Sequence, residues 1–237
     1  MTGKFRSLQA TDGGTFDAYV AMPKPVQTPA PGLILFCEVL GITDWVKETV
    51  NLFASKGYCV IAPDIFWRQH PGFVADHTKP ESIAIGVGYK HNLDHALAMD
   101  DTRVVIEALK AMPDCNGKIG AVGYCIGGTL TYMTAARIGL DAAVSYYGTQ
   151  IHEFLELKND ITCPTLMHMG NRDDHVPENL ASQIRDAMAE NPNIAVETYS
   201  AGHAFCNTHR PKYYLPEACA AANDRTFALL ERLKTSE

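Results

Sequence analysis

Short apolar runs alternate with longer stretches in which apolar residues recur at helical spacing along most of the chain. A continuous apolar run is typical of a strand buried on both faces, and a period near 3.6 residues is typical of a helix. Strands are therefore predicted at 33–39, 58–65, 118–124, 141–147, 165–169 and 194–199, with an edge strand or hairpin at 14–22. Helices are predicted at 44–56, 93–111, 128–136, 177–189 and 216–233, with a short one at 151–158. For the first helix, Asp44 is the predicted N-cap and Gly57 the stop signal.

This order of elements predicts an α/β fold with a mostly parallel central sheet and helices on both of its faces. The polar segment 68–91, which contains Gly and Pro, is interpreted as an excursion between two elements, without a helix or strand assigned to it. Because no internal repeat or long linker interrupts the pattern, residues 1–237 are expected to form a single domain. In such folds the functional side chains gather at the carboxyl ends of the strands.

Composition narrows the function classes. The chain has 237 residues, of which 46% are hydrophobic, and a formal net charge of −7 without a block of basic residues. We therefore expect neither a nucleic-acid partner nor a membrane partner, and nothing in the surface pattern demands more than a monomer or a weak homo-oligomer. No signal-peptide pattern is seen in residues 1–15, and the longest apolar run, 32–42, is too short to span a bilayer.

The number and spacing of the cysteines indicate the cellular compartment and argue against two kinds of site. Seven cysteines are scattered along the chain without a C-x-x-C pair. This pattern predicts neither a disulfide framework nor a zinc site, and it fits a reducing cytoplasm best.

One cysteine stands in a motif that carries chemistry. The segment Gly123-Tyr124-Cys125-Ile126-Gly127 follows a predicted strand and precedes a predicted helix. A G-x-nucleophile-x-G sequence in this context is the pattern of a nucleophile elbow, in which glycines permit a sharp turn. A helix N-terminus also favours the thiolate form of a cysteine. Cys125 is therefore a candidate nucleophile; the alternative is a buried cysteine at an ordinary connection.

A cysteine nucleophile needs a base, and the base needs an acid that orients it. Downstream of Cys125, Asp173 follows a predicted strand with the spacing Gly-x-x-Asp-x-x-Val-Pro, and His203 follows the next strand within Gly202-His203-Ala204-Phe205. The order nucleophile, acid, histidine is that of the α/β-hydrolase arrangement. Asp174 is the competing acid, a helix cap is the alternative role for Asp173, and the other eight histidines are interpreted as structural or surface residues.

A fourth candidate lies near the start of the chain. Glu38 ends a predicted buried strand, so its carboxyl group is expected to be desolvated and to need a partner. In an α/β-hydrolase arrangement the oxyanion hole uses one N–H from the loop after this strand and one from the residue after the nucleophile. These would be the backbone N–H groups of Val39 and Ile126. The alternative for Glu38 is a helix-capping or salt-bridged carboxylate.

Six collinear segments together resemble the dienelactone hydrolase family, whose members include carboxymethylenebutenolidases. The segments are Cys37-Glu38-Val39-Leu40-Gly41, Ala62-Pro63-Asp64, Val122-Gly123-Tyr124-Cys125-Ile126-Gly127-Gly128, Ser145-Tyr146-Tyr147-Gly148, His168-Met169-Gly170 with Asp173, and Ala201-Gly202-His203-Ala204-Phe205. The resemblance implies an α/β-hydrolase fold without a large cap domain, no metal and no cofactor. It further implies a Cys125–His203–Asp173 triad that hydrolyses a small ester or enol-lactone through an acyl-cysteine, with Glu38 holding the resting thiol away from His203.

The sequence departs from the family where a substrate carboxylate would be held. Family members that open dienelactone use arginines, but no arginine occurs between Arg68 and Arg103, and Asn207 stands four residues after His203. The substrate therefore stays open between an anionic lactone and a less anionic ester, and Trp67, Tyr89 and Phe205 are candidate pocket residues.

Three alternative functions are also considered. A thioester or amide acyl hydrolase or transferase would use the same triad. A non-catalytic binding protein would be expected to lack a member of the triad. A redox role for Cys125 or Cys206 lacks a resolving cysteine nearby in sequence.

Overall fold

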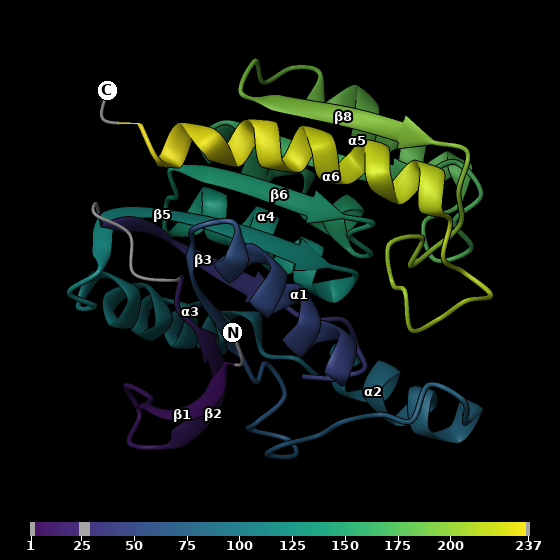
Figure 1. Cartoon of the computed structure of the whole chain (residues 1–237). Helices are drawn as coiled ribbons and strands as arrows, with labels where there is room; N and C mark the ends of the chain where they lie inside the picture. Colours follow the sequence, from purple (N-terminus) through teal and green to yellow (C-terminus); the bar gives the residue numbers. More distant parts are fainter. Residues whose placement is uncertain (1–2, 24–28, 236–237) are drawn as a thin grey trace. The chain divides into compact units, whose positions relative to one another are not determined.

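The computed structural model describes residues 3–23 and 29–235, and the chain divides into two compact units between Gly120 and Ala121. Each unit contains both strands and helices (Figure 1). The expectation of a single domain over the whole chain stays a prediction.

The first unit contains a small mixed sheet. Its strands β1 (Lys4–Gln9), β2 (Thr15–Ala21), β4 (Cys59–Pro63) and β3 (Ala30–Phe36) are neighbours in that order. β1, β2 and β4 pair antiparallel, which confirms a hairpin near 14–22, and β3 pairs parallel with β4. Every residue of β3 and β4 is buried, as their continuous apolar runs predicted. Helices α1 (Asp44–Ser55) and α3 (His95–Lys110) cover opposite faces of this sheet (Figure 1).

Two local predictions in this unit are wrong. The excursion at 68–91, to which no helix was assigned, contains the helix α2 (Pro80–His91), of which only Gly86 is buried. Its apolar residues do not form one stripe, so the helical period gave no signal. At α1 the N-cap is Thr43, whose hydroxyl accepts from Val46 N at 3.4 Å, while Asp44 lies in the first turn and pairs with Lys47.

The second unit contains the parallel strands β6 (Ala142–Tyr146), β7 (Thr165–Gly170) and β8 (Ile194–Tyr199), preceded by the last residues of β5 (Cys115–Tyr124). Helices α4 (Ile126–Arg137) and α5 (Glu178–Met188) lie on one face of these strands, and α6 (Pro216–Leu230) lies on the other (Figure 1). The described part of this unit also contains the 3-10 helices η1 (Ile151–Glu153), η2 (Leu155–Asp160) and η3 (Glu231–Leu233). The predicted mostly parallel α/β architecture is therefore confirmed.

One disulfide corrects the expectation drawn from the cysteine pattern. The structure joins Cys206 to Cys219, which are 13 residues apart in sequence and have Cα atoms 4.8 Å apart. The loop after β8 returns to the start of α6, and this tertiary contact leaves no mark in cysteine spacing.

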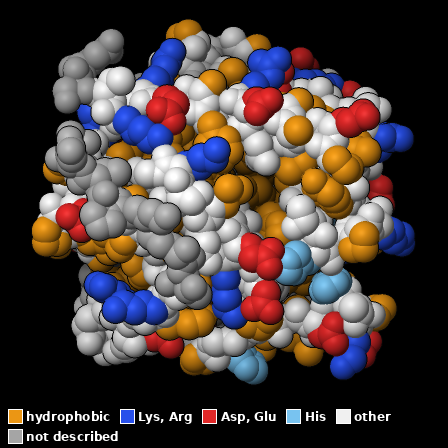
Figure 2. Space-filling view, viewed as in Figure 1, with side chains coloured by type: hydrophobic (Ala, Val, Ile, Leu, Met, Phe, Trp, Pro, Cys, Tyr) orange, Lys and Arg blue, Asp and Glu red, His pale blue; other side chains and the backbone are white. Residues whose placement is uncertain are grey.

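Two surface properties bear on the expected partners. Among the described residues, no helix combines the length and the apolar character that crossing a bilayer requires. On the face shown in Figure 2, acidic side chains lie between the Lys and Arg side chains, so no extended basic patch forms there.

Candidate active site

Cys125 occupies a sharp turn between β5 and α4, as the motif predicted. Its backbone has φ 58° and ψ −122°, a conformation that side chains other than glycine rarely adopt. The turn is fixed to the neighbouring strand, because Cys125 N donates to the carbonyl oxygen of Tyr146 at 3.0 Å. A Cβ atom at Gly123 would lie 1.9 Å from the Gly127 oxygen, so a side chain there is excluded.

The loops after β7 and β8 bring Asp173 and His203 together. Gly170 permits a close approach of these loops, since a Cβ atom there would lie 2.3 Å from the Ala201 oxygen. Arg172 N donates to the same carbonyl group at 3.0 Å. Asp173 and His203 are thus carried on two loops that are bonded to each other at the carboxyl edge of parallel strands.

The carboxylate of Asp173 is buried and fully engaged. Its Oδ2 lies 2.8 Å from His203 Nδ1, and its Oδ1 accepts from His175 N at 2.8 Å and Val176 N at 3.3 Å. Burial alone would raise the pKa of Asp173, but the hydrogen bond and the charge of His203 outweigh it and lower that pKa. Asp174, the competing acid, is exposed.

His203 contacts Cys125 as well as Asp173. Burial disfavours the imidazolium ion, yet the charge of the Cys125 thiolate and hydrogen bonds to Asp173 and Cys125 raise the pKa of His203 to about 10. The arrangement therefore favours a protonated His203 near neutral pH, with Asp173 fixing Nδ1. A histidine held in this way beside a cysteine is the partner that a thiol nucleophile requires.

Tyr147 is a site residue that the sequence analysis did not single out. Its ring packs against His203 with centroids 5.0 Å apart. Among the described residues, the non-glycine residues with positive φ are Cys125, Tyr147 and Ala204. All three belong to this site or adjoin it, and such strain is typical of functional sites. The Tyr-Tyr-Gly segment at the end of a predicted strand was the available signal.

The other candidates have different surroundings. Glu38 and Val39 follow β3 in the first unit, and the predicted burial of Glu38 is confirmed, with 3% of its surface exposed. Ile126 is the first residue of α4, so its N–H is one of the donors that a helix leaves unpaired within itself. The described residues contain no group of side chains arranged to hold a metal ion.

The three pocket candidates all make packing contacts. Trp67 stacks on Phe16 and donates to Asp101 at 2.8 Å, and Tyr89 packs against Phe73. Phe205 has no exposed surface. It lies among three tyrosine rings, those of Tyr146, Tyr147 and Tyr199. Packing is therefore what the structure shows for them, and their pocket role stays a prediction.

Comparison with known proteins identifies the family and the fold of the chain. Residues 16–234 match the model of the dienelactone hydrolase family. Carboxymethylenebutenolidase 1 of Cupriavidus pinatubonensis is 33% identical over 227 residues, which cover 96% of each chain. The carboxymethylenebutenolidase of Pseudomonas putida is 33% identical over 98% of this chain and 97% of its own. A putative dienelactone hydrolase from Klebsiella pneumoniae has the same fold, with a TM-score of 0.83, 24% identity and coverage of 98% of this chain and 99% of its own. The chain therefore has an α/β-hydrolase fold and is a hydrolase that belongs to the dienelactone hydrolase family.

Proposed function

We propose that this hydrolase cleaves a small ester or enol-lactone through an acyl-cysteine intermediate, with Cys125 as nucleophile, His203 as acid and base, and Asp173 as the group that orients His203. The observation that carries the proposal is the position of His203, whose ring is hydrogen-bonded to both other side chains. Relatives named carboxymethylenebutenolidase, which match nearly the whole chain, support the substrate class.

In the first half of the reaction, the Cys125 thiolate attacks the carbonyl carbon and the carbonyl oxygen becomes an oxyanion. The N–H of Ile126, at the start of α4, is positioned to donate to that oxygen. Collapse of the tetrahedral intermediate breaks the bond to the leaving oxygen, which takes the proton of the His203 imidazolium. In an enol-lactone the leaving oxygen stays attached to the acyl group, so ring opening yields one acyl-cysteine.

In the second half, neutral His203 takes a proton from water, and the hydroxide oxygen attacks the thioester carbonyl. Expulsion of the thiolate releases the carboxylic acid and restores the imidazolium–thiolate pair. Asp173 holds the Nδ1–H in both halves, so Nε2 always faces the reacting atoms. Val39 as the second oxyanion donor and Glu38 as the group that restrains the resting thiol remain parts of this proposal.

The proposal has two versions, which differ in the charge of the substrate's acid portion: an anionic lactone or a less anionic ester. Asn207 stands where the resemblance to the family implies an arginine in members that open dienelactone, and an amide does not offer the charged fork that binds a carboxylate. This difference favours a substrate that is less anionic than a dienelactone.

The direct test compares kcat/KM on a carboxylate-bearing dienelactone with kcat/KM on a neutral aryl ester, using Cys125→Ala as the control. We expect hydrolysis of both classes to disappear in the variant while its fold is retained. Higher kcat/KM on the neutral ester supports the less anionic substrate. Full activity of Cys125→Ala contradicts the proposed nucleophile, and transfer of the acyl group to an added amine in preference to water contradicts hydrolysis.

A further inference from the structure

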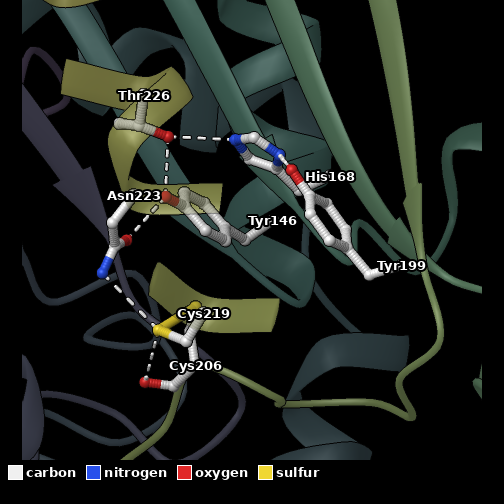
Figure 3. Close-up of a disulfide and its surroundings, with 7 residues drawn as sticks. All are labelled: Tyr146, His168, Tyr199, Cys206, Cys219, Asn223 and Thr226. Carbon is white, nitrogen blue, oxygen red and sulfur yellow. Dashed lines mark hydrogen bonds between the residues drawn. A yellow bond between two sulfur atoms is a disulfide. The ribbon is translucent and has the colours of Figure 1, made fainter. Parts of the chain in front are cut away.

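The disulfide adjoins the candidate active site in the chain. Cys206 comes three residues after His203, on the loop that follows β8, and Cys219 lies in the first turn of α6. Both cysteines are buried, with 4% and 6% of their surface exposed. The bond therefore fixes the segment that carries His203 to a helix packed on the strands of the same unit (Figure 3).

A chain of partly buried and buried hydrogen bonds begins at the same disulfide. Asn223 Nδ2 donates to Cys219 Sγ at 3.5 Å, and Asn223 Oδ1 lies 2.8 Å from the Tyr146 hydroxyl. That hydroxyl lies 2.6 Å from Thr226 Oγ1, which lies 3.0 Å from His168 Nε2. The chain links α6 to β6 and β7 without a break (Figure 3).

One set of proton positions satisfies every member of this chain. The sulfur of a disulfide carries no proton, so it accepts from the Asn223 amide, and Asn223 Oδ1 is left to accept from Tyr146. Tyr146 then accepts from Thr226, and Thr226 accepts from the Nε2–H of His168. His168 Nδ1 finally accepts from the Tyr199 hydroxyl at 2.9 Å. The bridged sulfur therefore sets the direction of the whole network.

The backbone of the same residues holds the candidate active site. The carbonyl group of Tyr146 accepts from Cys125 N at 3.0 Å, and the carbonyl group of His168 accepts from Tyr147 N at 2.7 Å. Tyr147 in turn packs against the ring of His203. The network thus contacts the nucleophile turn and the His203 loop from the core side.

The surroundings of Cys219 accommodate both oxidation states. If the bond is reduced, the Cys219 thiol has an acceptor in place, because its Sγ lies 3.9 Å from the carbonyl oxygen of Cys206. The Asn223 amide can still donate to the thiol sulfur. Neither state leaves Cys219 without a polar partner, as a reversible bond requires.

We propose that Cys206 and Cys219 form a reversible thiol–disulfide pair that positions His203, so that the bridged enzyme turns over faster than the dithiol enzyme. This inference rests on the proposed function. In the reduction, a thiolate of dithiothreitol attacks one sulfur and forms a mixed disulfide. The second thiol of the reagent then displaces the protein sulfur, leaving two protonated cysteines and a cyclic disulfide. Oxidised glutathione, a small disulfide, reverses the reaction by taking up both electrons.

The test measures aryl-ester hydrolysis in samples whose oxidation state is verified by thiol counting after denaturation. The bridged form has five free cysteines, including Cys125, and the reduced form has seven. We expect kcat of the reduced form to be lower by roughly 3- to 10-fold at unchanged KM. This is less than the 100-fold that a 1 Å misplacement can cause, because buried Phe205 keeps the loop near its place. Equal kcat in the two verified forms, or seven free thiols after oxidation, overturns the proposal.

Variants separate this role from a general effect of reducing agent. Cys206→Ser should have the kcat of the reduced form under both conditions. Cys163→Ser, at a free buried cysteine before β7, should respond to oxidation as the unmodified enzyme does.

A readout independent of turnover is the pH profile of Cys125 alkylation by iodoacetamide, followed by peptide mass spectrometry. Because His203 pairs with Cys125, looser positioning of His203 should move the profile to higher pH in the reduced form. If the protein cleaves no ester but its alkylation profile shifts on reduction, the positioning role of the disulfide is supported and the proposed function is contradicted. An unmoved profile overturns the positioning role.

Discussion

Two buried histidines of the second unit differ in charge although both lie away from water. His168 is fully buried on β7, and His203 is 8% exposed on the loop after β8. Burial, with the positive charge of Arg225, lowers the pKa of His168 to about 3. At His203 burial acts in the same direction, but the charges and hydrogen bonds of Cys125 and Asp173 raise the pKa to about 10.

The difference shows that partners, not burial, decide what a buried histidine does. His168 meets the hydroxyl groups of Tyr199 and Thr226, which satisfy its two nitrogens without stabilising a charge. His203 meets two groups that carry negative charge, so it becomes the positive member of a reactive cluster. The ring of His168 is therefore structural, and the ring of His203 is suited to proton transfer. Changing the partners of either histidine should change its pKa and its role.

The largest expected effect comes from making the partner of His203 neutral. Asp173→Asn should reduce kcat by about 10⁴-fold, because an amide does not hold the Nδ1–H form of the ring. It should also lower the pKa of His203 by roughly 1–3 pH units. Steady-state kinetics and imidazole NMR titration measure the two effects. Asp174→Asn, at an exposed position, is the matched control and should keep nearly full activity. The reverse result would transfer the orienting role to Asp174.

The next effect concerns the stability of the fold in acid. The folded-state pKa of His168, about 3, lies below the ordinary value near 6.5, so below that value the unfolded chain binds more protons than the folded one. His168 should therefore remove about 1.4 kcal/mol of stability for each pH unit between roughly 6 and 3. Urea unfolding of the unmodified protein and of His168→Gln over this range measures it. We expect their difference in unfolding free energy to shrink as pH falls; a constant difference contradicts the neutral His168.

The titration of His203 has the opposite dependence on pH, whereas that of Asp173 has the same direction as that of His168. The raised pKa of His203 means that its contribution to stability is complete below about pH 6.5 and is lost as the pH rises toward 10. The lowered pKa of Asp173 means that its contribution is complete above about pH 4 and is lost as the pH falls. These contributions are present in both the unmodified protein and His168→Gln, so they cancel in the difference between the two unfolding free energies.

A smaller loss of stability should follow from removing the hydroxyl group between Tyr146 and His168. Thr226→Val keeps the shape of the side chain but leaves two buried donors or acceptors unsatisfied, which costs about 1–3 kcal/mol. Thr131→Val is the matched control, since Thr131 is equally buried and its hydroxyl bonds only to the helix carbonyl of Gly127. Chemical denaturation compares the two variants, and equal losses would show that the network adds nothing beyond packing.

The smallest expected effect comes from replacing the buried carboxyl group of Glu38. Because Glu38 is proposed to restrain the resting thiol, Glu38→Gln is predicted to change the alkylation rate of Cys125 by roughly 3- to 10-fold. Iodoacetamide alkylation across a pH series measures it, with Glu48→Gln, on α1, as the control. Identical profiles for the unmodified protein and Glu38→Gln would remove the restraint of the resting thiol by Glu38.

The sequence determined the strand and helix alternation, the turn at Cys125 and the candidates Asp173 and His203. Each depends on a signal within a few residues: apolar runs, glycines that flank a nucleophile, and polar residues directly after a strand. Where the local signal was weak the prediction failed, as for α2, whose apolar residues form no stripe, and for Thr43, which replaced Asp44 as the cap of α1.

Only the tertiary structure decided which distant side chains meet. Nothing near Cys206 in the sequence indicates Cys219, and nothing near Tyr146 indicates Thr226, 80 residues further on. The opposite charge states of His168 and His203 depend on such meetings as well, since the residues directly next to each histidine are apolar or glycine and do not distinguish the two. A hydrogen bond or disulfide acts over a few ångströms in space, whereas sequence patterns report only on neighbours along the chain.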